Sequence, residues 1–584
     1  NDQCRCRVGL QACQALLCMA GLLDGKPRLG QVIGNHLGQT GVVLDYEQRI
    51  HGASVEPGLG PCWGKVLQTH ALRENPSMLD TSVLTPDAPL RLDHVVLRHA
   101  QERPTAMALS QEGRTLTYAQ LAHQVEHASQ TLRELGVQSG DRVACLSFNT
   151  WEMLVLLLAL ARLGAMLAPL NYRLAAAEWD QLMVDCQPRL LLHDHGWQTQ
   201  AHELSRRHAV PAHTLTQLCV PDDPLGVSPG IQDAAAKASA YAAVISERWR
   251  RGEAVDTRPV LLVYTSGTTG LPRAAVHTQA NLLANMHAAS TAMSMHASDR
   301  VLTVLPLFHV GGLCIQTLPA LGVGARVTLQ SRVDPQAMLD VLVQERIGLT
   351  VVVPAIMKAL IEQPRWAQAD LSALRCVMAG SSHLPEPLVR AFLERGIPLG
   401  NVYGATETGP FSIALVADAA RVLQGACGWP VPGVQARLGP LDGADAHTGE
   451  VWLRGPAVVQ QYWPDRPALD EHGWFHSGDV AQVDEAGCWT IVGRSKDMII
   501  SGGENIYPAE IETLLAQHPA VAECAVIGLP DARWGERVVA VVALRDGHTA
   551  SDDELLVPVR ERLARYKHPR DVMRVPVLPK TALG

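Results

Sequence analysis

Several features that would place a protein in a well-known class are missing from this sequence of 584 residues. Its 13 cysteines are odd in number and include no CxxC pair, which indicates free thiols in a reducing compartment rather than disulfides or a zinc site. The formal net charge is −9, so the chain lacks the basic character that nucleic-acid binding needs. No internal repeat of fixed period is present. We therefore expect a globular cytoplasmic protein whose partners are small molecules.

Long apolar runs of the kind that cross a membrane are also missing. The most apolar stretch, residues 153–170, contains Arg162 and Gly164, which favours a buried helix over a bilayer helix. Near the N-terminus, residues 8–23 are interrupted by two glutamines and are followed by no small-residue cleavage site. We expect neither a transmembrane span nor a signal peptide.

The composition is that of a globular enzyme, with 47% hydrophobic and 18% charged residues. The chain is too long for a single core, so we expect about two to four domains. From residue 90 onward, stretches of strand and helix character alternate, which predicts βαβ units and a parallel sheet. The expected strands are 141–148, 165–170, 190–193, 300–306 and 349–353, and the expected helices are 119–135, 150–163, 234–244, 281–295, 335–345 and 385–394.

The two ends of the chain differ from this alternating part. Residues 1–88 show no regular alternation, and we expect an uncharacterised N-terminal extension there. Beyond residue 425, short strands such as 449–454 and 488–492 are separated by turns, which predicts a small β unit. Residues 510–584 alternate short helices and strands, which predicts a compact α+β piece.

The most informative stretch that is present is a polar loop after the apolar run 261–264. Residues 265–270 are all Thr, Ser or Gly, and Arg273 follows shortly after. Glycine lets main-chain N–H groups approach a ligand, and successive N–H groups form a concave anion site to which hydroxyls and an arginine add donors. A solvent-facing loop is the alternative, because the patterns G-x-x-x-x-G-K-[ST] and G-x-G-x-x-G are both absent here.

Further polar motifs follow this loop in a fixed order. Taken singly, each has a plainer explanation: His309 as a packed histidine, Glu407 as a solvated surface acid and Asp479 as a turn cap. Their order and spacing are what give them weight as a set. The motifs are PLFHVGG at 306–312, NVYGATETG at 401–409, HSGD at 476–479, GRSKD at 493–497 and SGGEN at 501–505.

Together these motifs resemble the adenylate-forming superfamily, which includes acyl-CoA synthetases, peptide-synthetase adenylation domains and beetle luciferases. The resemblance covers roughly residues 90–584. It implies an α/β fold, with an AMP-binding domain over 89–495 made of two βαβ-type subdomains plus a small β-barrel. A small, mobile α+β C-terminal domain over 496–584 would follow. It further implies an enzyme that uses ATP and Mg²⁺ to convert a carboxylic acid to acyl-AMP and then to the thioester of coenzyme A.

The resemblance also assigns roles to single residues. Glu407 would bind Mg²⁺, a cation that prefers oxygen ligands, and Thr406 would contact the α-phosphate. His309 would lie at the mouth of the acyl pocket, together with Val310, Gly311 and Gly312, where the two glycines leave room for an acyl tail. The β- and γ-phosphates would be held by Thr265, Ser266, Gly267, Thr268, Thr269, Gly270 and Arg273.

The remaining roles concern the nucleoside and the acceptor thiol. Asp479 would accept hydrogen bonds from the ribose hydroxyls, and Arg494 would assist it. Lys496 would be the hinge for a rotation of the C-terminal domain between the two half-reactions. Adenine would be bordered by Gly380, Ser381, Ser382, Asn401 and Tyr403, and coenzyme A by Ser501, Gly502, Gly503 and Glu504.

Three departures from the family pattern stand out. Arg273-Ala274 replaces the usual Lys-Gly, which keeps the charge but changes its geometry. The turn Gly380-Ser381-Ser382 replaces the commoner Gly-Ala-Pro. The family's catalytic lysine would be the residue directly after Gly584, so residues 1–584 are expected to bind ATP without supplying that lysine.

Other readings of the same motifs remain open. The enzyme would activate a medium- or long-chain fatty acid or an aryl acid. An adenylating enzyme that loads an acyl carrier protein is one alternative, and a catalytically silent nucleotide-binding protein is another. A homodimer is compatible with the sequence.

Overall fold

The computed structural model describes residues 89–220, 255–265, 273–380, 384–441, 444–501, 504–531, 534–563 and 565–579. At residues 496, 500, 504, 505, 535 and 566 it describes the backbone alone. The N-terminal extension 1–88 and the helix expected at 234–244 lie outside the described residues.

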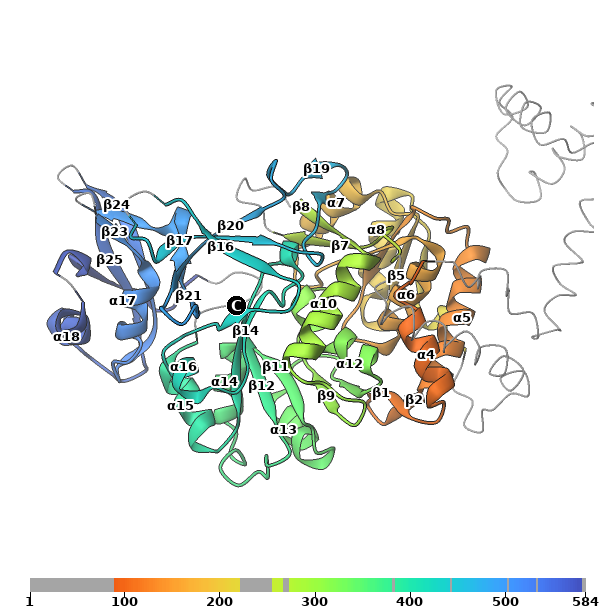
Figure 1. Cartoon of the computed structure of the whole chain (residues 1–584), viewed down its shortest axis with the longest axis horizontal. Helices are drawn as coiled ribbons and strands as arrows, with labels where there is room; N and C mark the ends of the chain where they lie inside the picture. Colours follow the sequence, from red (N-terminus) through yellow and green to blue (C-terminus); the bar gives the residue numbers. More distant parts are fainter. Residues whose placement is uncertain are drawn as a thin grey trace, which may run out of the picture. The chain divides into compact units, whose positions relative to one another are not determined.

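One large sheet gathers strands from the first part of the described chain and from a later segment (Figure 1). The pairs that involve its middle strands are parallel, as βαβ units require, whereas the strands beyond 272 pair antiparallel. In spatial order the strands are β19 (Arg466–Pro467), β18 (Gln461–Tyr462), β8 (Arg273–Thr278), β7 (Pro259–Thr265), β4 (Met166–Pro169), β3 (Arg142–Leu146), β5 (Leu190–His193) and β6 (Ala212–Thr214).

A second large sheet has a parallel centre, with antiparallel strands at both edges. In spatial order its strands are β15 (Trp429–Pro430), β14 (Ile413–Leu415), β13 (Leu399–Tyr403), β12 (Cys376–Gly380), β11 (Leu349–Val352), β9 (Arg300–Thr303), β10 (Arg326–Leu329), β1 (Met107–Gln111) and β2 (Arg114–Thr117). The helices of this part of the chain are α4 (His94–Glu102), α5 (Tyr118–Glu134), α6 (Trp151–Leu163), α7 (Ala176–Cys186), α8 (Gln198–His208), α10 (Gln279–Ala292), α12 (Leu318–Val323), α13 (Pro335–Gln344), α14 (Pro354–Ile361), α15 (Glu386–Glu394) and α16 (Ala419–Leu423).

Helix α6 accounts for the most apolar stretch of the sequence. The Thr150 hydroxyl accepts a hydrogen bond from the Met153 N–H and caps its start, and Gly164, at φ 73°, ends it in a left-handed conformation. All of its residues except Leu163 are buried, because the main hydrophobic core surrounds it on every side. No helix in the described part of the chain is both long and apolar enough to cross a bilayer.

Two smaller sheets follow. The first is antiparallel and consists of β16 (Gln435–Gly439), β17 (Thr448–Arg454), β20 (Phe475–Val483) and β21 (Trp489–Arg494). The second packs with α17 (Pro508–Leu515) and α18 (Asp552–Arg562) around a hydrophobic core of its own. Its strands are β23 (Glu504–Ile506), β22 (Ile499–Ser501), β25 (Gly535–Leu544), β24 (Val521–Asp531) and β26 (Asp571–Arg574).

The α/β fold class predicted from strand and helix alternation is confirmed. Among the differences in bounds, the helix expected at 281–295 is α10 (Gln279–Ala292), and the strand expected at 300–306 ends at Thr303 as β9. Residues 304–308 leave the sheet because Asn149 captures this segment: its Nδ2 donates to Leu305 O at 3.0 Å, and its Oδ1 accepts from Leu307 N at 2.8 Å. The segment thereby delivers His309 to the end of the sheet.

Candidate active site

The ends of the Thr/Ser/Gly loop are held together by a hairpin. Strand β7 ends at Thr265 and strand β8 begins at Arg273, and these two residues are antiparallel partners. The Thr265 hydroxyl donates to Arg273 O at 3.3 Å. The predicted phosphate-binding residues between them, Ser266, Gly267, Thr268, Thr269 and Gly270, lie outside the described residues.

Glu407 lies on a short turn directly after β13. The turn is the 3₁₀ helix η6 (Thr406–Thr408), which ends at Gly409 in the left-handed region. Desolvation raises the pKa of Glu407, although the Tyr462 hydroxyl donates to its Oε1 at 2.9 Å. Among the described side chains, no arginine or lysine forms an ion pair with Glu407. A half-buried carboxylate that forms no ion pair with a described side chain is suited to a cation.

Tyr462 contacts Glu407 but belongs to none of the sequence motifs. It lies on β18, beside Ala275 of β8, and its ring is 5.9 Å from the Arg273 guanidinium. Arg273, Tyr462 and Glu407 therefore form one cluster that joins the loop hairpin to the Glu407 turn. A signal was present in the sequence: the aromatic pair at 462–463 follows two glutamines in a chain with only 4% aromatic residues.

Asp479 has a different set of partners. Its Oδ2 accepts from the Tyr403 hydroxyl at 2.8 Å and its Oδ1 accepts from Arg494 Nε at 2.9 Å. The turn before it needs Gly478 at φ 73°, and the Ser477 hydroxyl accepts from Asp479 N. Desolvation raises the pKa of Asp479, and the Arg494 charge opposes that shift without cancelling it. The structure thus brings Asp479 and Arg494, both expected at the ribose, together with Tyr403, which was expected at the adenine.

Two other predicted nucleoside residues make contacts within the protein. The amide of Asn401 is buried, and its Nδ2 donates to Ala426 O at 2.9 Å. Gly380 lies against β13, where a Cβ would come within 2.6 Å of Val402 O. Both residues therefore position the strand that carries Tyr403. Ser381 and Ser382 lie outside the described residues.

His309 has a defined protonation state. It caps the start of α11 (Val310–Gly312), and its Nδ1 accepts from Gly311 N at 3.0 Å. Burial lowers its pKa, so the ring is neutral and its proton is on Nε2. Gly312 also has a packing constraint, because a Cβ there would overlap the carbonyl oxygens of Leu305 and Pro306.

The predicted hinge and coenzyme A residues follow β21. Lys496 lies in the 3₁₀ turn η7 (Ser495–Asp497), but its side chain is outside the described part. Ser501 is buried at the end of β22. Gly502 and Gly503, as well as the Glu504 side chain, are not described.

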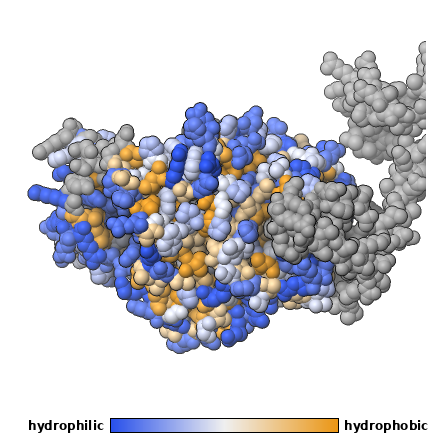
Figure 2. Space-filling view, in the orientation of Figure 1, coloured by the Kyte–Doolittle hydropathy of each residue, from blue (hydrophilic) through white to orange (hydrophobic). Residues whose placement is uncertain are grey.

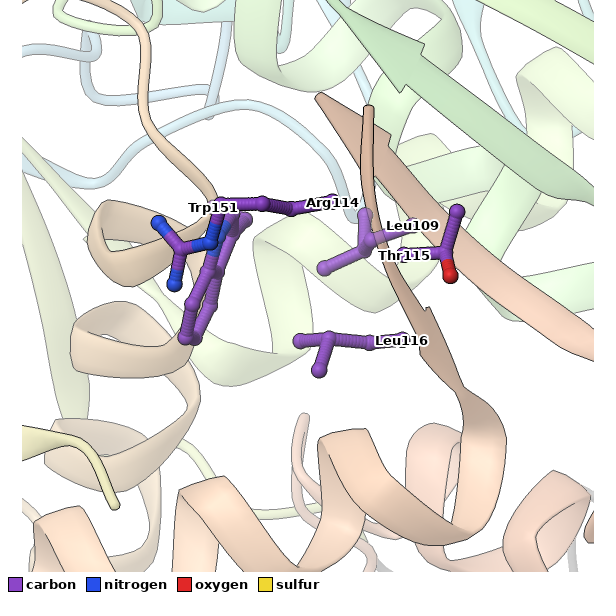
Figure 3. A pocket seen from close by; sticks show the side chains of 5 residues that line it. All are labelled: Leu109, Arg114, Thr115, Leu116 and Trp151. Carbon is purple, nitrogen blue, oxygen red and sulfur yellow. The ribbon is translucent and has the colours of Figure 1, made fainter. Parts of the chain in front are cut away.

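A shallow pocket elsewhere in the chain contains none of these residues (Figure 3). Its lining comes from the β1–β2 hairpin and the start of α6, and it consists of Leu109, Arg114, Thr115, Leu116 and Trp151. The Arg114 guanidinium lies 4.7 Å from the centre of the Trp151 ring and donates to Glu152 at 3.2 Å. These contacts give the pocket a structural explanation.

Comparison with known proteins identifies the family. Residues 96–463 match the AMP-binding enzyme family, and residues 510–584 match the AMP-binding enzyme C-terminal domain. The chain belongs to the AMP-binding enzyme family. As a member it is an AMP-forming acid–thiol ligase that uses ATP, Mg²⁺ and coenzyme A.

The relatives share most of their length with this chain. An indoleacetate–CoA ligase of Aromatoleum aromaticum is 42% identical over 85% of this chain and 96% of its own. A feruloyl-CoA synthase of an Amycolatopsis species is 39% identical over 84% and 96%. ATP-bound MatB of Rhodopseudomonas palustris has a TM-score of 0.72 at 28% identity, over 85% and 97%. MenE of Bacillus subtilis, in complex with ATP and magnesium, has a TM-score of 0.70 at 27% identity, over 84% and 97%.

The residues present fit a bound Mg²⁺. Within the described chain, no group of three or more His, Cys, Asp or Glu side chains could hold a metal, so a cage made of protein ligands is not seen there. Mg²⁺ is commonly held by one or two carboxylates together with substrate phosphates. Glu407, whose pKa is raised and which forms no ion pair with a described arginine or lysine, is the carboxylate suited to that arrangement.

Proposed function

We propose that this enzyme activates an aryl-substituted carboxylic acid, of the indoleacetate or hydroxycinnamate class, and transfers it to coenzyme A. The observation that carries the proposal is the Arg273–Tyr462–Glu407 cluster beside Thr406, because it places charge for phosphates next to a carboxylate reserved for a cation. The preference for aryl over fatty acids is supported by the relatives named for indoleacetate and ferulate.

In the first half-reaction a carboxylate oxygen of the acid attacks the α-phosphorus of ATP. An acyl–phosphate bond forms, and the bond from the α-phosphorus to pyrophosphate breaks. Arg273 and the hydroxyl of Thr265 would orient the β- and γ-phosphates, and Thr406 would orient the α-phosphate. Mg²⁺ held by Glu407 would offset the repulsion between the two anions.

Asp479 and Tyr403 would fix the nucleoside during this step. Both Asp479 oxygens already accept one hydrogen bond each, and a carboxylate oxygen has a second lone pair for a ribose hydroxyl. The Arg494 charge favours the ionised form of Asp479, which can only accept hydrogen bonds. This arrangement supports a binding role for Asp479 rather than a proton-transfer role.

In the second half-reaction the coenzyme A thiolate attacks the acyl carbonyl. A carbon–sulfur bond forms, and the carbon–oxygen bond to AMP breaks, so that AMP leaves. His309 is suited to orient the acyl group, because its Nε2–H is a donor and its ring is neutral. We propose that rotation about Lys496 brings residues 501–504 to the thiol, with 89–495 as the adenylation domain and 496–584 as the lid. The separate core of the C-terminal sheet supports this division.

The test is pyrophosphate release by the full-length protein across indoleacetate, ferulate and decanoate. We expect acid-dependent release with the highest kcat/KM for an aryl acid, and thioester formation when coenzyme A is added. Fastest turnover of decanoate would reverse the substrate assignment. Thioester formation on a phosphopantetheinylated carrier protein alone would favour the activity named for a relative that is a fatty acid–[acyl-carrier-protein] ligase. Absence of acid-dependent release with every acid would reject the proposed function.

A further inference from the structure

The helix that His309 caps contains a π-helical turn. Residues of α11 run into the π-helical segment η5 (Leu313–Thr317) and then into α12. The Leu318 N–H donates to Leu313 O, five residues back, and the Thr317 hydroxyl donates to Gly312 O at 2.6 Å. π-helical turns are rare in proteins, and those that occur are often located at functional sites. This one directly follows the wall of the candidate acyl pocket.

The next carbonyl in the turn, that of Cys314, cannot be served in the same way. The residue five positions further on is Pro319, which has no N–H to donate. Asn285 of α10 supplies the donor instead, with its Nδ2 at 2.7 Å from Cys314 O. Both residues are 1% exposed, so water does not take over this bond. The wall helix therefore depends on a side chain from a neighbouring helix.

The other end of the same amide faces the Glu407 turn. Gly409 ends that turn at φ 68°, and a Cβ placed on it would lie 3.3 Å from Asn285 Oδ1. Among the described residues, Asn285 Oδ1 has no hydrogen-bond partner. Asn285 thus lies between the acyl wall, which its Nδ2 holds, and Gly409 at the end of the turn that carries Glu407, near which its Oδ1 lies.

Helix α10 reaches the Glu407 turn by a second route as well. Asn281 lies one helical turn before Asn285 on the same face, and its Nδ2 donates to Pro456 O at 2.8 Å and to Val458 O at 3.1 Å. The following residue, Val459, donates its N–H to Glu407 O at 2.8 Å. Figure 1 shows α10 between the β7–β8 hairpin and α12. The helix is therefore placed to hold both halves of the site in register.

We propose that Asn285 is a positioning residue that couples binding of the acid to binding of the nucleotide. The inference rests on the proposed function, because it takes the helix after His309 as the acyl wall. A shift of that wall on acid binding moves Cys314 O, and Asn285 transmits the shift to Gly409 and the Glu407 turn. Coupling of this kind is reciprocal, so each ligand tightens the other by the same factor.

The direct test replaces the amide by a carboxylate of the same shape. Asn285→Asp removes the donor to Cys314 O and keeps the volume. Calorimetry gives the Kd of indoleacetate with and without Mg²⁺ and α,β-methylene-ATP, an analogue that cannot adenylate the acid because its methylene bridge replaces the bond that breaks. We expect the nucleotide to tighten acid binding about fivefold or more in the wild type and about onefold in the variant, with a lower kcat in pyrophosphate release.

Gln279→Glu is the matched control. Gln279 is a buried amide on the same helix. Its Nε2 donates to Ala161 O at 2.9 Å, and its Oε1 accepts from Leu92 N. Both partners lie far in sequence from the two halves of the site. Gln279→Glu also loses one buried amide donor, so its change in Tm reports the stability cost of a buried carboxylate on this helix alone. We expect a comparable fall in Tm with the acid–nucleotide coupling retained.

A second-site change separates positioning from simple packing. Pro319→Ala restores an N–H that can serve Cys314 O, so in the Asn285→Ala background it should recover Tm but leave the coupling near onefold. Full recovery of the coupling, or unchanged coupling in Asn285→Asp, would overturn the inference while leaving the proposed function intact. If the wild type releases no pyrophosphate with any acid, the proposed function fails and this inference falls with it.

Discussion

Glu407 and Asp479 are two carboxylates in similar surroundings with different partners. Burial raises the pKa of each, and each accepts a hydrogen bond from a tyrosine, Tyr462 at 2.9 Å and Tyr403 at 2.8 Å. Asp479 also receives the Arg494 guanidinium, whereas no described arginine or lysine forms an ion pair with Glu407. The protein thus pairs Asp479 with its own arginine and leaves Glu407 to be neutralised mainly by a ligand. An internal partner suits the binding of neutral hydroxyls, and the lack of one suits a cation.

The largest effect on activity is expected from Glu407→Gln. This variant tests the carboxylate that forms no ion pair with a described arginine. The amide keeps the shape but removes the charge that holds Mg²⁺, so kcat for acid-dependent pyrophosphate release should fall by about 10²–10³-fold. A Mg²⁺ titration of the rate should shift to higher concentrations in the same variant. Unchanged Mg²⁺ dependence would show that the difference between the two carboxylates is not about a metal.

Asp479→Asn tests the carboxylate that has an arginine. It should weaken nucleotide binding, seen as a roughly 10-fold higher KM for ATP, because hydrogen bonds to a charged acceptor contribute about 1.5–3 kcal/mol. The Mg²⁺ dependence should stay as in the wild type. If Asp479→Asn shifted the Mg²⁺ titration as strongly as Glu407→Gln, the two carboxylates would share one role.

Paired tyrosine variants sharpen the comparison further. Tyr462→Phe removes one hydrogen bond from Glu407, and Tyr403→Phe removes one from Asp479, with the ring kept in both. We expect a several-fold loss of kcat in the first and a several-fold rise in KM for ATP in the second. The two effects should separate cleanly in steady-state kinetics, and the reverse pattern would contradict the assigned roles.

How much of this site could be foreseen differs between the two carboxylates. The Asp479 side was anticipated because Asp479, Arg494 and Tyr403 each belong to a motif through which the sequence resembles the adenylate-forming superfamily. The antiparallel pair β20–β21 places Asp479 opposite Arg494. Tyr462 was missed because it comes from a two-residue strand added to the edge of a distant sheet. Its contact with Glu407 depends on tertiary packing that no local pattern encodes.

The fold shows the same division. Helices with a clear cap and a uniform apolar character, such as α6, were located to within a residue at each end. The strand expected at 300–306 was extended too far, because apolar residues continue past Thr303 while Asn149 pulls the chain out of the sheet. The packing constraint on Gly312 was also missed, since the approach of the Leu305 and Pro306 carbonyls is invisible in the sequence. Long-range polar contacts are what sequence patterns leave out.

The smallest expected effect concerns stability. Burial raises the pKa of Glu407, so ionising this carboxyl lowers the free energy of unfolding. The loss is complete above the raised pKa and absent below the unfolded-state pKa of about 4.3. Glu407→Gln should therefore raise the Tm of the ligand-free protein by about 1–2 °C at pH 8, and the gain should shrink as the pH falls toward 5. Asp479→Asn should give a smaller gain, because Arg494 loses its partner. An equal rise in Tm for both variants, or a rise that does not change with pH, would mean that the lack of an ion pair at Glu407 does not lower stability.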